Sequence, residues 1–86
     1  MEFTWSERKR ALNLKEHRLD FVDAPSVFEG LTYTFEDDRF SYDEQRFITL
    51  GLLAGIPVRL NAEVRPAWAR CYGVQVPCGS ADLDSL

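Results

Sequence analysis

The chain has 86 residues, 45% of them hydrophobic and 28% charged, and its formal net charge is −4. This length supplies one hydrophobic core, so we expect a single domain over residues 1–86, and the composition excludes a disordered chain. No apolar run approaches the roughly 20 residues of a membrane span, and the N-terminus lacks the basic and apolar regions of a signal peptide, so we expect a cytoplasmic protein without membrane contact.

The first predicted elements are a short strand or anchor at residues 3–5 and a helix over residues 7–17. Ser6 is a good N-cap for this helix, and the residues after it are strong helix formers. Leu12 and Leu19 fall on one stripe, which predicts an amphipathic helix with a narrow apolar face.

Basic side chains cluster on this helix and just after it, although the chain as a whole is acidic. A negative net charge argues against general affinity for nucleic acid, because contacts to phosphate need Lys and Arg. The cluster therefore has two interpretations: a patch that faces phosphate, or an ordinary solvated helix face. Its members are Arg8, Lys9, Arg10, Lys15 and Arg18.

A second, shorter helix is predicted to begin after Asp20 or Asp23 and to run through Phe28, with Gly30 ending it. Pro25 favours the later start, because proline is tolerated in a first helical turn and not deeper. The buried face of this helix is expected to consist of Phe21, Ala24, Val27 and Phe28.

The following residues predict a β-hairpin and the start of a third strand. Residues 31–35 alternate apolar and hydroxyl side chains, as in a half-buried strand, and residues 45–53 form the second strand after an acidic turn. Ala54 and Gly55 can make a tight turn into a strand that begins at Ile56. The predicted fold class is α+β, with two N-terminal helices packed on an antiparallel β-sheet.

Beyond Ile56 the pattern weakens, and it leaves the C-terminal strands undetermined. Pro57 fits only the edge or the start of a strand, whereas Pro66 and Pro77 interrupt the strand-compatible residues that follow. Residues 80–86 are typical of an acidic, frayed tail.

The two cysteines, Cys71 and Cys78, do not have a CxxC spacing, and only His17 could join them as a nitrogen ligand. We therefore expect no metal site. In a reducing cytoplasm both are expected to be free thiols, and neither has a neighbouring histidine that would activate it as a nucleophile.

Four stretches of the chain carry motifs that are specific in combination. The first has an aromatic-x-Trp start, a Lys four residues after the Trp, and then Asn and His; the second reads Phe-x-x-Ala-x-x-Val-Phe. The stretches are residues 3–17, 20–28, 34–39 and 44–52. In these motifs the part of the chain over residues 3–53 resembles the BrnT family of toxins.

The resemblance implies a small ribonuclease toxin of a type II toxin–antitoxin system, with a RelE-like fold. It implies RNA cleavage without a metal or other cofactor, in which a 2′-hydroxyl attacks the adjacent phosphate. Such chemistry needs a proton acceptor, cations that stabilise the phosphorane, and a proton donor for the leaving oxygen. The implied partners are RNA and a BrnA-like antitoxin, with DNA contacted only through that antitoxin.

The chain departs from the family pattern at Ser6, Glu16 and Arg18, and more strongly after Val58. Arg18 replaces a glycine, and a side chain there costs about 1 kcal/mol if the site is left-handed. After Val58 the Thr-Glu-Arg-like segment and the Ile-Ile-Ser-x-Arg-like strand of the family do not appear, and residues 56–86 are divergent. We hypothesise that a shift of reading frame or a deletion replaced the end of the toxin. The alternative function is then a degenerate, inactive homologue that only binds the antitoxin.

The catalytic candidates are Lys9, His17 and Arg46, which match positions of the family. His17 could handle protons or donate a structural hydrogen bond at the helix end. Lys9 could hold phosphate or pair with an acid such as Glu36, and Arg46 is suited to phosphate beside a sheet face.

The candidate RNA-binding residues are Arg8, Arg10, Lys15 and Arg39. For Arg39 the alternative is local pairing in the acidic turn. The aromatic side chains of the hairpin could stack on RNA bases, but core packing is the favoured interpretation. These aromatics are Tyr33, Phe35, Phe40 and Phe47.

Overall fold

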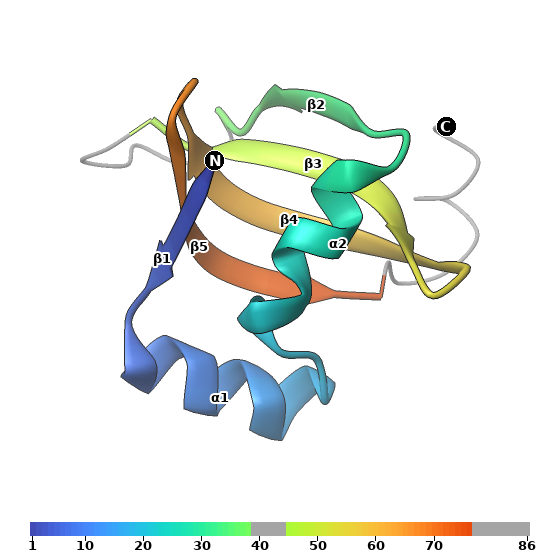
Figure 1. Cartoon of the computed structure of the whole chain (residues 1–86). Helices are drawn as coiled ribbons and strands as arrows, with labels where there is room; N and C mark the ends of the chain where they lie inside the picture. The colour runs from blue at the N-terminus through green and yellow to red at the C-terminus, as the bar shows by residue number, and fades with distance from the viewer. Residues whose placement is uncertain (39–44, 77–86) are drawn as a thin grey trace.

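The computed structural model describes residues 1–38 and 45–76, and in these residues two α-helices and a 3-10 turn accompany five strands (Figure 1). In chain order the elements are β1 (Glu2–Trp5), α1 (Glu7–His17), the 3-10 turn η1 (Phe21–Asp23), α2 (Ala24–Glu29), β2 (Tyr33–Glu36), β3 (Phe47–Leu53), β4 (Ile56–Val64) and β5 (Trp68–Gln75). Arg39, Phe40, Pro77 and Cys78 lie outside the described residues, as does the acidic tail at residues 80–86.

The strands form one sheet that is antiparallel, as predicted, except at one edge, which makes it mixed. Their order is β1-β5-β4-β3-β2, and every neighbouring pair is antiparallel except β1 and β5. The parallel pair joins the two ends of the described chain and sets Trp5 opposite Cys71. Side-chain alternation identifies a strand but does not indicate the direction of its partner. The parallel pairing of β1 with β5 therefore cannot be predicted from the sequence. The α+β class is confirmed.

One face of the sheet is covered by η1 and α2, which bury the residues predicted for them (Figure 1). Phe21, Ala24 and Val27 are buried, and Phe28 packs against the same core. The close approach of α2 to β3 requires a glycine at position 51, because a Cβ on Gly51 would lie 2.7 Å from Val27 Cγ1.

The strands β4 and β5 complete this core from the part of the chain where the sequence pattern is weakest. Pro57 is the second residue of β4, and Pro66 lies in the turn that separates β4 from β5, so neither removes an interior ladder bond. The buried apolar side chains of the two strands are Val58, Leu60, Ala62, Ala69, Cys71 and Val74.

The turn between β3 and β4 matches the prediction. Leu53 pairs with Ile56, and the two residues between them have φ of 50° at Ala54 and 80° at Gly55. Two positive φ values in a two-residue loop are the geometry that suits the twist of a hairpin. The predicted third strand does begin at Ile56.

The strand predicted at residues 31–35 is confirmed over residues 33–35, but its half-buried character is wrong. β2 begins at Tyr33 and ends at Glu36, and all four of its residues are exposed. Because β2 is the outer strand of the sheet, core packing of Tyr33 and Phe35 is also wrong; instead their ring centroids lie 5.7 Å apart at the surface. Phe47, in β3, is half-buried.

Polar contacts hold α1 against the edge of the sheet; of the predicted apolar stripe, Leu19 packs against the core and Leu12 does not. Leu12 is 46% exposed, and the buried residue of this helix is Asn13. The Asn13 side chain accepts a hydrogen bond from the Val74 N–H (3.0 Å) and donates to the carbonyls of Val74 (2.9 Å) and Leu19 (2.8 Å). β1 pairs with β5 only as far as Cys71, and Asn13 satisfies the backbone of Val74 beyond that point.

Both ends of α1 follow from the sequence. The Ser6 hydroxyl accepts a hydrogen bond from the Lys9 N–H at 3.4 Å, as an N-cap does. At the other end Arg18 has φ 58° and ψ 28°, a left-handed conformation that favours glycine. Asp20 caps η1 instead of α2, by accepting from the Val22 N–H at 3.2 Å.

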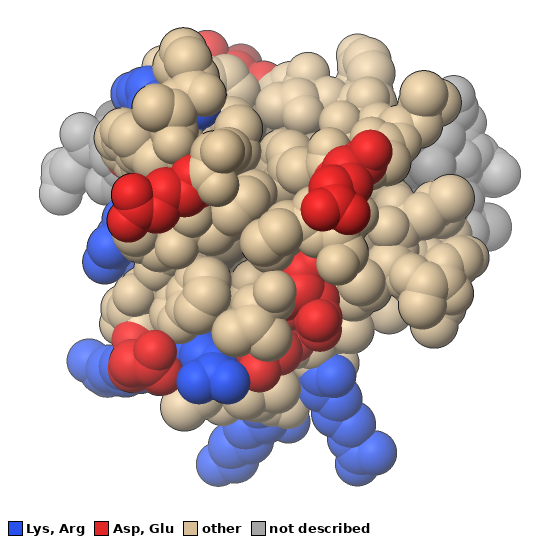
Figure 2. Space-filling model, in the orientation of Figure 1, with Lys and Arg blue, Asp and Glu red and all other residues tan. Residues whose placement is uncertain are grey.

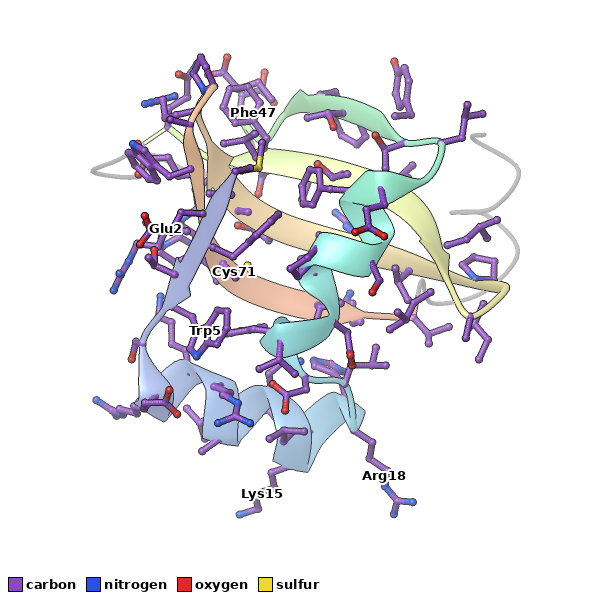
Figure 3. All side chains as sticks on the ribbon, in the orientation of Figure 1. Glu2, Trp5, Lys15, Arg18, Phe47 and Cys71 are labelled. Atoms are coloured by element: carbon purple, nitrogen blue, oxygen red, sulfur yellow. The ribbon has the colours of Figure 1, made fainter. Side chains whose placement is uncertain are left out.

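Replacing Arg18 with glycine is expected to raise the free energy of unfolding by about 0.5–1 kcal/mol, because glycine adopts this φ without a steric cost. The Arg18 side chain projects away from the body of the molecule, so its loss removes little packing (Figure 3). Urea denaturation measures the change. Arg18→Ala keeps the Cβ and serves as the control; equal stability of the two variants would contradict the argument.

Candidate functional site

A groove of about 250 Å³ runs between α1 and β5. The helix contributes side chains from successive turns, which share one face, and the strand contributes its last residues. The polar and charged residues that line the groove are Lys9, Asn13, Glu16, His17, Tyr72 and Gln75. Two of the three catalytic candidates therefore meet in one groove.

The third catalytic candidate, Arg46, contacts Tyr72, one of the residues that line the groove. The guanidinium carbon of Arg46 lies 4.0 Å from the centroid of the Tyr72 ring, and the ammonium nitrogen of Lys9 lies 4.6 Å from it. Both distances are within the range of cation–π contacts. The fold thus gathers two cations around one phenol ring from three segments that are distant in sequence.

The backbone around Arg46 is tied to two strands. Its carbonyl accepts a hydrogen bond from the Asp37 N–H at 2.8 Å. Asp37 is buried, and its Oδ2 accepts from the Asn61 side-chain amide of β4 at 2.9 Å. The backbone of the residue that directly precedes β3 is therefore fixed by hydrogen bonds to neighbouring segments.

Tyr72 occupies a β-bulge, which explains why it faces the groove. Asn61 pairs with Gly73 and Ala62 pairs with Cys71, so Tyr72 is the additional residue on β5. A bulge redirects a side chain relative to strict alternation. The sequence does not predict a site role for Tyr72, because a bulge depends on the register of two strands and leaves no local signal.

His17 lines the groove at the end opposite Lys9. The two residues are separated by eight positions of α1, about two turns or 12 Å along the helix axis. His17 Nε2 lies 3.8 Å from Glu16 Oε2. The groove therefore has the Lys9 ammonium at one end and the His17 imidazole at the other.

Arg10, a candidate for RNA binding, is engaged in hydrogen bonds to two carboxylates of the same chain. Its guanidinium donates to both Asp20 carboxylate oxygens at 2.8 Å and to Glu7 at 3.3 Å. These contacts join α1 to η1. The hydrogen bonds from Arg10, with a further one from the Val22 N–H, lower the pKa of Asp20 below its ordinary value.

Replacing Asp20 with asparagine is expected to lower the free energy of unfolding by about 1 kcal/mol at pH 7. Because the pKa of Asp20 is depressed in the folded state, its contribution is present above the unfolded-state pKa and disappears as the pH falls through the folded-state value. Urea denaturation of both proteins at pH 7 and pH 3 should therefore show a difference that shrinks in acid. A difference that grows in acid would contradict this assignment, and Glu7→Gln, at an exposed partner of the same Arg10, is the control.

Basic side chains gather where α1 lies, whereas acidic patches interrupt the largely uncharged face that α2 covers (Figure 2). Arg8 and Lys15 are exposed on α1, and Lys15 projects away from the body of the molecule (Figure 3). Neither lines the groove between α1 and β5. Arg39, the remaining RNA-binding candidate, lies outside the described residues.

Cys71 is a buried free thiol of the core, as expected. Burial raises its pKa to about 11, so the thiol stays protonated at neutral pH. A protonated, inaccessible thiol is not a nucleophile.

Within residues 1–38 and 45–76, neither α-helix has the length and apolar character needed to cross a membrane.

Comparison with protein families gives a match over residues 5–61, to the family described as the ribonuclease toxin BrnT of a type II toxin–antitoxin system. The matched range makes up more than half of the 86-residue chain. It contains Lys9, His17 and Arg46, and it ends before β5, which carries Tyr72. A comparison with curated proteins gave no match.

Proposed function

The chain belongs to the BrnT family of ribonuclease toxins of type II toxin–antitoxin systems, and from this premise we propose that it cleaves RNA in the groove between α1 and β5 without a metal ion. The observation that carries the proposal is the convergence of Lys9 and Arg46 on the ring of Tyr72. In this proposal the site acts in the cytoplasm, on RNA.

Lys9 and Arg46 hold the scissile phosphate. Arginine offers a planar fork of donors that matches two phosphate oxygens, and lysine adds a point charge. When the 2′-hydroxyl attacks, negative charge grows on the phosphorane oxygens, and cations already in place stabilise it. This positive charge takes the part that a metal ion has in other nucleases.

Proton transfer falls to the hydroxyl of Tyr72 and the imidazole of His17. The attacking 2′-hydroxyl loses a proton as its oxygen bonds to phosphorus, and the departing 5′-oxygen gains one as its bond to phosphorus breaks. The products are a 2′,3′-cyclic phosphate and a 5′-hydroxyl. Tyr72 lies at the cationic end of the groove and His17 at the other end, which supports Tyr72 as the group nearer the bonds that change.

Arg8 and Lys15 would contact the phosphates of the RNA outside the groove, since they are exposed on the helix that forms one of its walls. We propose the same contact with RNA phosphates for Arg39. Arg10 does not, because its donors are engaged by Asp20 and Glu7.

Membership of a type II toxin family implies an antitoxin partner. We propose that this partner is BrnA-like, that it blocks the groove when bound, and that the toxin meets DNA only through it.

Purified protein should cleave RNA in the presence of EDTA and leave 2′,3′-cyclic phosphate ends, which can be identified by mass spectrometry. Lys9→Ala should lower the rate by about 10²-fold, because it removes one of the cations that stabilise the transition state. Arg8→Ala is the matched comparison, because Arg8 neighbours Lys9 in α1 but does not line the groove; it should weaken RNA binding and leave the rate at saturating RNA unchanged. Cleavage that requires an added metal would contradict the mechanism. Antitoxin binding with no cleavage would favour the inactive homologue.

A further inference from the structure

A second hollow, of about 270 Å³, lies on the face of the sheet opposite α2. Val58 and Leu60 of β4 point into the core beneath η1 and α2, so the alternate residues Arg59 and Asn61 point to the other face. The hollow spans two neighbouring rows of cross-strand partners: Ile48–Asn61–Gly73, and Leu50–Arg59–Gln75. It is lined by Ile48, Arg59, Asn61, Gly73 and Gln75.

This hollow adjoins the groove between α1 and β5. Gly73 and Gln75, near the end of β5, line both the hollow and the groove. Gly73 has no side chain to separate them, and a Cβ built there would come no closer than 3.9 Å to another atom, Asn13 Oδ1. A chain that binds in the groove can therefore continue across β5 into the hollow.

The hollow brings together three polar side chains, from Arg59, Asn61 and Gln75. The Asn61 amide is fixed by donating to Asp37 Oδ2 at 2.9 Å, and its Oδ1 is buried and accepts no hydrogen bond from the described residues. A buried acceptor gains strongly from a donor that reaches it. Arg59 offers donors, Gln75 offers both donors and an acceptor, and Ile48 supplies an apolar floor.

We propose that this hollow binds the base of a nucleotide that flanks the cleaved bond, and that Arg59, Asn61 and Gln75 set the sequence preference of the ribonuclease. The inference rests on the proposed function, since it requires RNA in the adjoining groove. Donors and acceptors on a base edge are what such side chains recognise in single-stranded RNA. Phosphate contacts by Lys9 and Arg46 would position the RNA, and the hollow would recognise the identity of the base.

The test uses 2′-O-methyl hexanucleotides of each single base, which cannot be cleaved, and measures their affinity for the full chain by fluorescence anisotropy. Wild-type protein should bind one of the homopolymers about tenfold more tightly than the weakest. Gln75→Leu should reduce this preference to about twofold, and Arg46→Ala should weaken all four by a similar factor. Circular dichroism verifies that each variant is folded.

A second variant tests the passage between the two spaces. Gly73→Val should fold, because valine suits a strand and the space for its Cβ is open. Its methyl groups would narrow the place where the hollow and the groove meet, so the base preference should be lost, whatever the change in overall affinity for RNA. The proposal is overturned if Gln75→Leu and Gly73→Val keep the wild-type preference, or if wild-type protein binds all four homopolymers equally. Failure to bind any of them would contradict the proposed function itself.

Discussion

Replacing Arg46 with alanine is expected to lower the single-turnover rate of RNA cleavage by about 10²–10³-fold, the usual cost of removing a preorganised group that stabilises transition-state charge. The guanidinium lies against the Tyr72 ring that Lys9 also contacts, so in the proposed mechanism its removal takes one of the two cations from the phosphorane. Measurement with enzyme in excess over a labelled oligonucleotide separates the chemical step from product release.

The matched variant for this test is Arg46→Lys. Lysine keeps the charge but loses both the planar stacking on Tyr72 and the paired donors, so an intermediate rate is expected. The structure also ties the Arg46 backbone to Asp37, a bond that neither substitution removes. A rate within about threefold of wild type for Arg46→Ala would remove Arg46 from the mechanism.

Replacing Asn13 with leucine is expected to lower the free energy of unfolding by about 2–4 kcal/mol, the largest effect on stability expected of any single residue of α1. The amide of Asn13 satisfies the N–H and carbonyl of Val74 and the carbonyl of Leu19. Leucine has a similar volume but leaves these backbone groups unpaired where β1 no longer covers β5.

Urea denaturation measures this loss, and Lys15→Ala is the control on the same helix. Lys15 projects away from the body of the molecule, so its substitution should change stability by less than about 0.5 kcal/mol (Figure 3). A loss below about 1 kcal/mol for Asn13→Leu would mean that water replaces the amide at the edge of β5.

The N-terminal elements could be predicted because their signals are local. Ser6 caps α1, Pro25 sits in the first turn of α2, and Ala54-Gly55 makes the hairpin turn, each through contacts within a few residues. The core face of α2 follows from helical spacing alone. Local rules of this kind account for most of the chain up to β4.

The parts that could not be predicted depend on contacts between distant segments. The parallel edge joins residues at the two ends of the described chain, and the burial of Asn13 depends on where β1 stops along β5. Helical spacing predicts that Leu12 is buried and that Asn13 is not, because it takes no account of a strand edge that needs an amide. The role of Tyr72 depends on a bulge in the same strand.

Of the candidate site, the sequence indicated Lys9, His17 and Arg46, and the structure arranges all three around the groove or around Tyr72, which forms part of its wall. It could not indicate that Arg10 is engaged by Asp20, since that pair depends on how the chain returns after α1.

Residues 56–75 have a regular structure that their sequence pattern does not predict. Strands β4 and β5 bury alternate apolar residues and complete the core, which is more than a tail acquired by a shift of reading frame would be expected to supply. The hypothesis of a shift or deletion remains to be tested by translating the gene in its other two frames.

The measurement that tests the account most directly is a double-mutant cycle on the single-turnover rate, with Lys9→Ala, Arg46→Ala and the double variant. If both cations act on one phosphate at Tyr72, the second substitution should cost much less than the first, and the double variant should be within about tenfold of the slower single variant. Losses that multiply in full would show two independent sites, and would contradict the convergence of Lys9 and Arg46 on one reacting group.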